Sequence, residues 1–466
     1  MIQTPEEKNM IRKEWKIRAG FVGFGEVNTP REFIDSRCRI AAEELKKRGV
    51  ELFETAPVSD DPEGAQAQRA VEELSKGDFD ALVVCIAGWI PTWAVIKVIE
   101  PFKHKPMLLW GLSGWRENGH FVTTADQAGT TALRAPMTEM GYSFKYLVNK
   151  KDSAPRYDEA VAYLKAASAT AMMHHAFIGM SSYRDMRLFG TLYDGNLLKK
   201  KIGAEIEHFD LLEIKELSDA VTDSEIAEGA KKIRSNWKFV REPQEGTVEN
   251  SVRLSIAFQK KIKERSYDAF SFCDVDGVKK LLKFAPAGAL TLLHDEMEIP
   301  TVPENDSYGA VTELIMKYLT GVSPAYMEFY EFTEKSALMG VPDYVPASVT
   351  DGGITVMPNA FGSFGEGLLN VSKVKTGPVT LVRLAQVNGE LVIHALRGEA
   401  RTPETWEEAG WAPPAPQLPS LEVFFESGSS EEFIQNVMSQ HYIVTYGDNI
   451  TLIKEYAAIN GLKVIG

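Results

Sequence analysis

Apolar runs of strand length alternate with amphipathic stretches through the first third of the chain. An apolar run near Arg18–Gly23 predicts a buried strand. The next stretch, near Arg31–Arg48, has helical spacing and starts after Thr29 and Pro30, which suit a helix N-terminus. Strands that alternate with helices predict a parallel sheet with crossover helices. The same alternation predicts strands at Val50–Glu54, Ala81–Ile86 and Pro106–Trp110, and helices at Gly64–Lys76 and Tyr157–Met173.

The alternation restarts after His174 and His175, which predicts a second α/β domain. Its predicted strands are Ala176–Met180, Glu205–Asp210 and Ala269–Cys273, and its predicted helices lie near Asp223–Asn236, Thr247–Arg265 and Asp306–Leu319. From about residue 341 the pattern changes to short β-branched runs. Two of these runs, Pro378–Gln386 and Glu390–Arg397, flank Asn388-Gly389, which is a strong signal for a two-residue hairpin turn.

These patterns predict an α/β protein of 466 residues with three domains, because such a length is too great for one ordinary core. We expect an N-terminal Rossmann-like domain over 1–170 and a second Rossmann-like domain over 171–345. A C-terminal β-rich, barrel-like domain is expected over 346–466. In parallel sheets of this kind, ligands gather outside the carboxyl ends of the strands.

Charge and cysteine content narrow the class of protein. The formal net charge of −14 argues against nucleic acid or an anionic membrane as a partner, because phosphate binding needs a positive field. The three cysteines, Cys38, Cys85 and Cys273, are few, distant and odd in number, so we expect buried, reduced thiols. No apolar run of signal length is present in the first residues, and we therefore expect a cytoplasmic protein.

One stretch, Ala81–Ile99, is nearly continuous in apolar residues and approaches the length of a membrane span. Gly88 and Pro91 interrupt it. We expect a buried strand, a turn and a helix here, and no membrane segment.

Two acidic segments carry the strongest chemical signal in the chain. The first is Pro303-Glu304-Asn305-Asp306-Ser307-Tyr308-Gly309-Ala310, and the second is Pro324-Ala325-Tyr326-Met327-Glu328-Phe329-Tyr330. They resemble the paired carboxylate motifs of the L-fucose/L-arabinose isomerase superfamily, in which each motif supplies one metal ligand. The second motif reads Met-Glu-Asp-Tyr in the arabinose isomerase branch, which is close to residues 327–330 of this chain.

The resemblance implies Glu304 and Glu328 as metal ligands and places the third ligand at His441, a histidine before the final helix. A hard ion such as Mn²⁺, with Mg²⁺ or Co²⁺ as alternatives, accepts carboxylate and imidazole ligands and leaves positions for sugar oxygens. The implied reaction interconverts an aldose and its ketose through an enediolate, with Glu304 or Glu328 moving the proton. The arabinose branch has a further metal histidine, for which this chain offers only Asp343. That departure favours a three-ligand site.

The same comparison gives one candidate substrate contact, and residue chemistry at predicted strand ends gives others. Gln127 lies in a segment that resembles the one whose glutamine reaches the sugar, often from a neighbouring subunit. Asp274 follows a predicted strand and is either a site acid or a helix cap. The aromatic candidates for stacking on a sugar face, which could equally be packing residues, are Trp89, Trp93 and Trp115. The arginines near predicted strand ends, which could bind an anionic group or form surface ion pairs, are Arg116, Arg184 and Arg187.

Two questions stay open at the level of sequence. The substrate is either a neutral pentose or deoxyhexose, or a hexose with an anionic 6-substituent such as sulfoquinovose. A non-catalytic sugar-binding protein with two α/β domains is the alternative function. The family also implies a homo-oligomer, a hexamer, with active sites at subunit boundaries.

Overall fold

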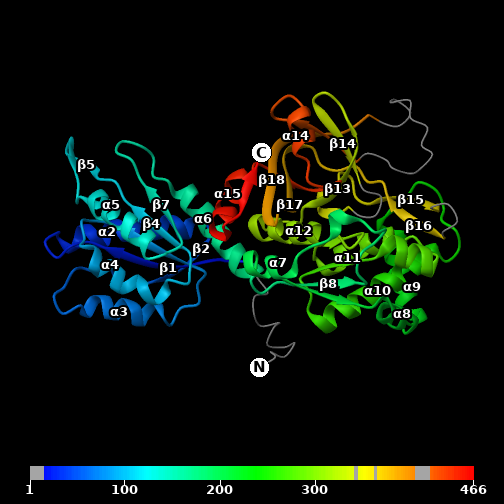
Figure 1. Ribbon diagram of the computed structural model, residues 1–466, viewed down its shortest axis with the longest axis horizontal. Helices are drawn as coiled ribbons and strands as arrows, with labels where there is room; N and C mark the ends of the chain where they lie inside the picture. The colour runs from blue at the N-terminus through cyan, green and yellow to red at the C-terminus, as the bar shows by residue number, and fades with distance from the viewer. Residues whose placement is uncertain (1–14, 341–344, 361–364, 405–419) are drawn as a thin grey trace. The chain divides into compact units, whose positions relative to one another are not determined.

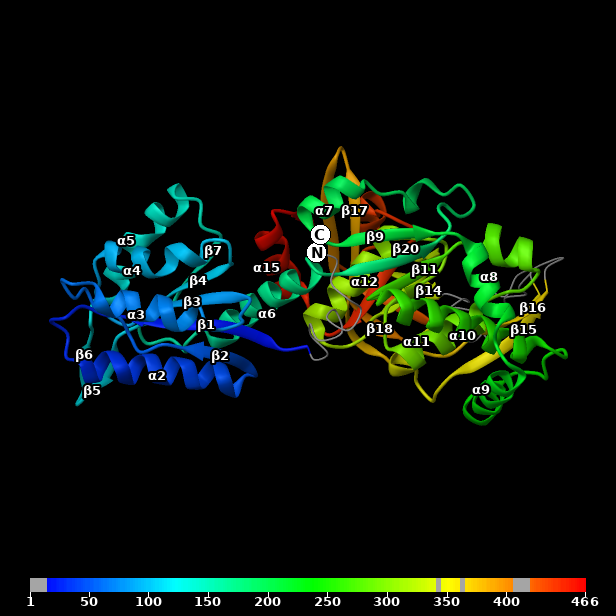
Figure 2. The same cartoon turned by 90° about the horizontal axis from the view of Figure 1, so that it is seen from below.

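The computed structural model describes residues 15–340, 345–360, 365–404 and 420–466. The chain divides into two compact units, and each is described by itself. The N-terminal unit comprises Glu14–Ala171 with Ala458–Asn460, and the C-terminal unit comprises Met172–Ala457 with Gly461–Gly466. Figure 1 labels the helices and strands, and Figure 2 shows them from a second direction.

The N-terminal unit is built on a five-stranded parallel sheet with the strand order β2-β1-β3-β4-β7. All six residues of β3 are buried, because helices cover both faces of the sheet. The strands are β1 (Ile17–Phe24), β2 (Val50–Glu54), β3 (Ala81–Ile86), β4 (Met107–Gly111) and β7 (Phe144–Val148).

Helices lie on both faces of this sheet (Figure 2). One face packs against α2 (Arg31–Lys47) and α6 (Tyr157–Met173). The other face packs against α3 (Ala65–Leu74), α4 (Thr92–Ile99) and α5 (Asp126–Glu139). A short hairpin follows β4 and consists of β5 (Trp115–Glu117) and β6 (His120–Val122), which the sequence pattern did not predict.

The C-terminal unit contains a second parallel sheet, with the strand order β12-β11-β8-β9. Its strands are β8 (Phe177–Ser181), β9 (Glu205–Phe209), β11 (Ala269–Phe272) and β12 (Thr301–Val302). The helices of this part are α7 (Gly195–Lys201), α8 (Leu211–Asp219), α9 (Asp223–Asn236), α10 (Thr247–Arg265), α11 (Ala287–Met297) and α12 (Ser307–Thr320). A π-helix, η3 (Asp274–Leu282), directly follows β11. A small three-stranded sheet joins β10 (Lys238–Phe239), β15 (Thr355–Ala360) and β16 (Glu366–Asn370).

The same unit also contains a closed six-stranded barrel, ordered β17-β20-β13-β14-β19-β18 and closed by pairing of β17 with β18. Its strands are β13 (Ala325–Phe332), β14 (Ser336–Gly340), β17 (Gly377–Val387), β18 (Glu390–Arg401), β19 (Leu421–Phe425) and β20 (His441–Tyr446). A short strand, β21 (Lys463–Ile465), pairs with β18 outside this ring. The last helices along the chain are α14 (Glu431–Asn436) and α15 (Ile450–Asn460). Helix α12 contacts β11 and β12 as well as β17 and β20, so it lies between the parallel sheet and the barrel (Figure 1).

The fold is therefore mixed α/β, with two parallel sheets and a closed barrel near the C-terminus. The predicted hairpin is confirmed: β17 pairs with β18 up to Val387 and Glu390, and Asn388 and Gly389 between them have φ values of 51° and 80°. Two barrel strands, β13 and β14, precede residue 346, where the sequence pattern places the start of the β-rich domain.

Two further expectations concern burial and membrane spans. The three cysteines are buried and free, as predicted. The stretch Ala81–Ile99 forms β3, a turn and α4, also as predicted. Across the described ranges, no helix combines the length and apolar character that crossing a bilayer requires.

Candidate functional site

The candidate site lies in the C-terminal unit, where the carboxyl ends of β8, β11 and β12 meet the barrel strands β13 and β20. Glu304 follows β12, and its Oε2 lies 3.9 Å from Nδ1 of His441, the first residue of β20. Glu328 in β13 is the direct antiparallel partner of His441. Directly opposed residues of antiparallel strands place their side chains on the same face. The structure thus brings Glu304 close to His441, and strand pairing puts Glu328 on the same face of the sheet as His441.

The backbone at Glu304 is held in an uncommon conformation. Glu304 and Asn305 have φ values of 63° and 51°, in the left-handed region that non-glycine residues seldom adopt. The Glu304 N–H donates to Oδ1 of Asp274 at 2.9 Å, and the Asn305 N–H donates to the Phe272 carbonyl at 3.1 Å. Gln440 Nε2 donates to Glu304 Oε2 at 3.3 Å. Backbone strain that surrounding bonds maintain is characteristic of functional sites.

A buried ion pair links this turn to the barrel. Asp306 caps α12 by accepting from the Gly309 N–H, and Arg383 of β17 donates to both its carboxylate oxygens at 2.6 and 2.7 Å. The Tyr326 hydroxyl also donates to Asp306, at 2.8 Å. Burial raises the pKa of Asp306, but the charge of Arg383 outweighs burial and leaves the pKa below its ordinary value. Asp306 is therefore ionised and fixes the position of the turn that carries Glu304.

His441 is buried, with 3% of its surface exposed, and its ring is stacked on Tyr326 at 4.5 Å between centroids. Burial lowers the pKa of His441 to about 4. The imidazole is consequently neutral at pH 7, which is the form that binds a metal ion.

Two further buried carboxylates lie next to the site, on the segments that follow β8 and β11. Asp274 accepts from Lys279 Nζ at 2.8 Å. Burial raises the pKa of Asp274, but the positive charge of Lys279 has the larger effect and the pKa lies below its ordinary value. Asp185 accepts from the Val275 and Asp276 N–H groups at 2.8 and 2.7 Å, and burial together with Asp274 raises its pKa to about 6. The cap residue of η3 is Cys273, so the Asp274 carboxylate binds Lys279 and the Glu304 N–H and does not cap the helix.

The side chains of Glu304, Glu328 and His441 form a donor set of the kind that binds a divalent ion. Two carboxylates and a neutral imidazole are ligands that Mn²⁺, Mg²⁺ and Co²⁺ accept, so the chemistry of Glu304, Glu328 and His441 fits such an ion. In the part of the chain that the structure describes, no three His, Cys, Asp or Glu side chains are already spaced as a complete ligand set. Asp343, the substitute for the further histidine, lies outside the described residues.

The two arginines predicted in this unit lie on the loop that follows β8. The Arg184 guanidinium lies 5.0 Å from the centre of the Phe189 ring. Arg187 is exposed and has a φ of 58°. Asp185, between them, is the residue that binds the N–H groups at the start of η3. The loop is therefore anchored beside the site.

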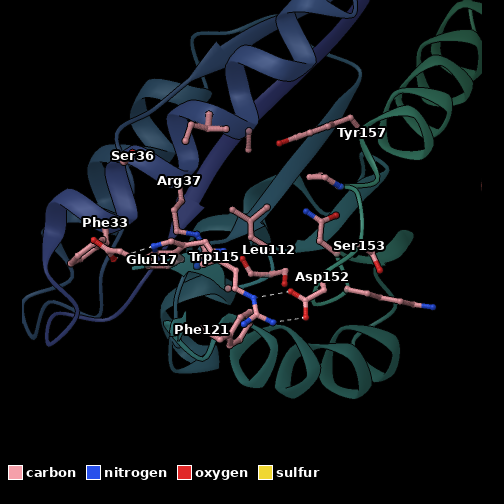
Figure 3. A pocket seen from close by; sticks show the side chains of 18 residues that line it. Phe33, Ser36, Arg37, Leu112, Trp115, Glu117, Phe121, Asp152, Ser153 and Tyr157 are labelled. Atoms are coloured by element: carbon pink, nitrogen blue, oxygen red, sulfur yellow. Dashed lines mark hydrogen bonds and ion pairs between the residues drawn. The ribbon is translucent and has the colours of Figure 1, made fainter. Parts of the chain in front are cut away.

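The other predicted substrate contacts belong to the N-terminal unit. Gln127 Nε2 donates to the Leu112 and Asn149 carbonyls at 2.8 and 3.2 Å, so its amide links the segments after β4 and β7. Trp89, in the connection between β3 and α4, is 40% exposed, and Trp93 on α4 is 47% exposed. Trp115 and Arg116 line a cavity, in which Figure 3 labels Trp115.

Several residues of the site were not predicted from the sequence. For Arg383 a signal was present: a lone arginine within the apolar run Thr380–Ala385 of a predicted strand needs a buried acid as partner. Nothing in the local pattern distinguishes the remaining ones, which are Asp185, Lys279, Tyr326 and Gln440.

No protein-family model matches the chain, and no curated protein matches it as a relative.

Proposed function

We propose that this protein is a cytoplasmic, divalent-metal-dependent aldose–ketose isomerase. One observation carries the proposal. Glu304 Oε2 lies 3.9 Å from His441 Nδ1 although the two residues are far apart in sequence, and Glu328 lies directly opposite His441 in the antiparallel pair of β13 and β20. The resemblance of the two acidic motifs to the L-fucose/L-arabinose isomerase superfamily supports the same assignment. The order of the parallel strands also supports Rossmann-like identity for both α/β parts.

In this proposal Glu304, Glu328 and His441 hold Mn²⁺, with Mg²⁺ and Co²⁺ as alternatives. When bound, the ion supplies Lewis-acid stabilisation of negative charge on adjacent sugar oxygens. Neutral His441 can contribute an imidazole without losing a proton first. Asp274 and Gln440 hold the backbone and the carboxylate of Glu304 in place.

The chemistry requires one proton to move between two carbons of an open-chain sugar. A carboxylate of Glu304 or Glu328 takes the proton from C2 of the aldose, and the electron pair forms an enediolate. The same proton, or one exchanged with solvent, is returned to C1, while the hydroxyl proton on O2 passes to O1. No oxidant or further reactant is needed, because the carbon oxidised and the carbon reduced belong to the same molecule.

The proposed substrate is a pentose or deoxyhexose, or a 6-anionic hexose such as sulfoquinovose. The loop after β8 supports the anionic option, because Arg184 and Arg187 lie on it beside the site and guanidinium groups bind anionic oxygens well. By resemblance, Gln127 is a proposed sugar contact of a homo-oligomer, a hexamer, with sites at subunit boundaries. Trp89 and Trp115, which could stack on a sugar face, and Arg116, which could bind an anionic group, are further proposed contacts. Sedimentation velocity would measure that assembly.

The test is an aldose panel in D₂O that includes glucose with a sulfonate at C6. Ketose formation and deuterium incorporation at C1 or C2 are followed by NMR, with Mn²⁺ or with EDTA. We expect ketose that carries solvent deuterium, only with the metal. Sugar binding that persists in EDTA without turnover would refute the isomerase and favour the sugar-binding protein.

Variants of the three ligands sharpen the test. Glu304→Gln, Glu328→Gln and His441→Asn should each weaken Mn²⁺ binding, measured by calorimetry, by about tenfold or more. Matched controls are Glu331→Gln, an exposed glutamate of the same strand as Glu328, and His175→Asn, an exposed histidine. Both controls should bind Mn²⁺ like the unchanged protein.

A further inference from the structure

The N-terminal unit contains a cavity of about 620 Å³ at the carboxyl edge of its parallel sheet. Its walls come from α2, the β5–β6 hairpin and the segment between β7 and α6, and their side chains face one hollow (Figure 3). The volume is within the range of small-molecule sites, and the carboxyl edge is where parallel sheets usually bind ligands.

One side of the cavity is aromatic and partly open to solvent. Phe33 and Trp115 lie 5.6 Å apart between ring centroids, and the Arg37 guanidinium lies 5.1 Å from the Trp115 ring. Phe33 is 37% exposed, Phe121 is 37% exposed, and Ile40 on the same rim is 48% exposed. Large apolar side chains left exposed around a hollow indicate a binding surface for a ring.

Asn149, just after β7, supplies a fixed hydrogen-bond donor. Its Oδ1 accepts from Trp110 Nε1 at 3.2 Å and from the Arg156 N–H at 3.1 Å. Both partners are donors only, so the orientation of the amide is determined. Asn149 is 8% exposed and lines the cavity, and no described residue accepts from its Nδ2. The side-chain N–H groups are therefore left for a ligand.

The charged side chains differ between the Trp115 side of the cavity and the Asn149 side. Arg37 is bound to Asp126, and Arg116 is bound through two hydrogen bonds to Asp152. Glu117 lies on the Trp115 side and accepts from its indole N–H at 3.4 Å. The Lys150 side chain is exposed and lines the cavity, and its ammonium forms no hydrogen bond or close ion pair with the described residues, while Glu159 interacts with its charge only at longer range. A hydrogen-bond donor at Asn149 and a cation at Lys150 thus follow each other along the chain.

We propose that this cavity binds a small molecule with a flat ring and an anionic oxygen, such as a carboxylate or sulfonate. The ring lies against Phe33, Trp115 and Phe121, and the anionic oxygen accepts from Asn149 Nδ2 and faces Lys150. Trp115 is also one of the proposed sugar contacts, but the inference uses none of the proposed metal ligands, so binding of the probe with or without sugar turnover distinguishes the two proposals.

The test uses naphthalenesulfonate as the probe and fluorine NMR of the full chain labelled with fluorotryptophan. We expect the Trp115 resonance, assigned with Trp115→Phe, to shift and saturate with a Kd of about 1 mM or lower. The exposed Trp93, which does not line the cavity, should not shift. Absence of a saturable shift at Trp115 overturns the proposal.

Two charge variants locate the anionic group. Asn149→Asp keeps an oxygen for Trp110 and Arg156 but replaces the donor with a negative charge, so affinity should fall by about tenfold or more. Lys150→Glu, at an exposed position with no packing role, should weaken binding in the same direction. The control Asn28→Asp adds the same charge at an exposed site of the same unit and should leave the Kd unchanged. Equal affinity for both cavity variants and the unchanged protein would refute the assignment.

Discussion

Replacing Arg383 with methionine should destabilise the junction between the second parallel sheet and the barrel. The side chains of Arg383 and Asp306 are each 1% exposed, and the two groups share two short hydrogen bonds. Methionine retains much of the apolar stem of arginine. Among the described residues, it leaves the Asp306 carboxylate with hydrogen bonds from the Tyr326 hydroxyl and the Gly309 N–H alone. Removal of one partner from a buried ion pair costs about 3–5 kcal/mol, because the remaining charge is neither hydrated nor compensated.

Hydrogen exchange of the backbone amides of α12 measures this cost locally. A double-mutant cycle with Asp306→Asn isolates the interaction, since asparagine still caps the helix through the Gly309 N–H. We expect each single variant to lose about 3 kcal/mol or more of protection, and the double variant to lose much less than their sum. A loss below about 1 kcal/mol in Arg383→Met, or additive losses in the double variant, would refute the reasoning.

Two other predictions concern a pH effect and a turn. Burial raises the pKa of Asp126 to about 6, although Arg37 lowers it, so the folded state binds more protons than the unfolded state between roughly pH 4 and 6. The free energy of unfolding of the N-terminal unit should therefore increase as the pH falls through 6, by at most about 3 kcal/mol. Denaturant unfolding at pH 5 and pH 7 should show this increase in the unchanged protein and not in Asp126→Asn. An equal pH dependence in both proteins would contradict the assignment. Gly389→Ala should cost about 1–2 kcal/mol through backbone strain, since φ is 80° and no atom of the described part of the chain beyond the adjacent residues lies within 4 Å of the added Cβ. Gly190→Ala, equally open but without a positive φ, should show no such loss in thermal unfolding, and equal effects of the two variants would argue against the turn conformation.

The local pattern of the sequence was sufficient for most regular elements of the α/β parts. The predicted bounds of Val50–Glu54, Ala81–Ile86, Asp223–Asn236 and Thr247–Arg265 agree with β2, β3, α9 and α10. Hydrophobic periodicity reports which side of an element is buried, and that information is local to each segment. The hairpin at Asn388-Gly389 could be predicted for a similar reason, because its turn requires φ values that these two residues tolerate.

Closure of the barrel and assembly of the candidate site were decided by tertiary structure. The pairing of Glu328 with His441 joins strands distant in the chain, and no local period specifies which strands pair or in what register. The left-handed backbone of Glu304 depends on Asp274 and on the neighbouring strand β11, since its own residue type does not favour that conformation. The sequence contained the chemical groups of the site, while their proximity required long-range strand pairing and buried charges such as Arg383, which are stable only when their partners are already in place.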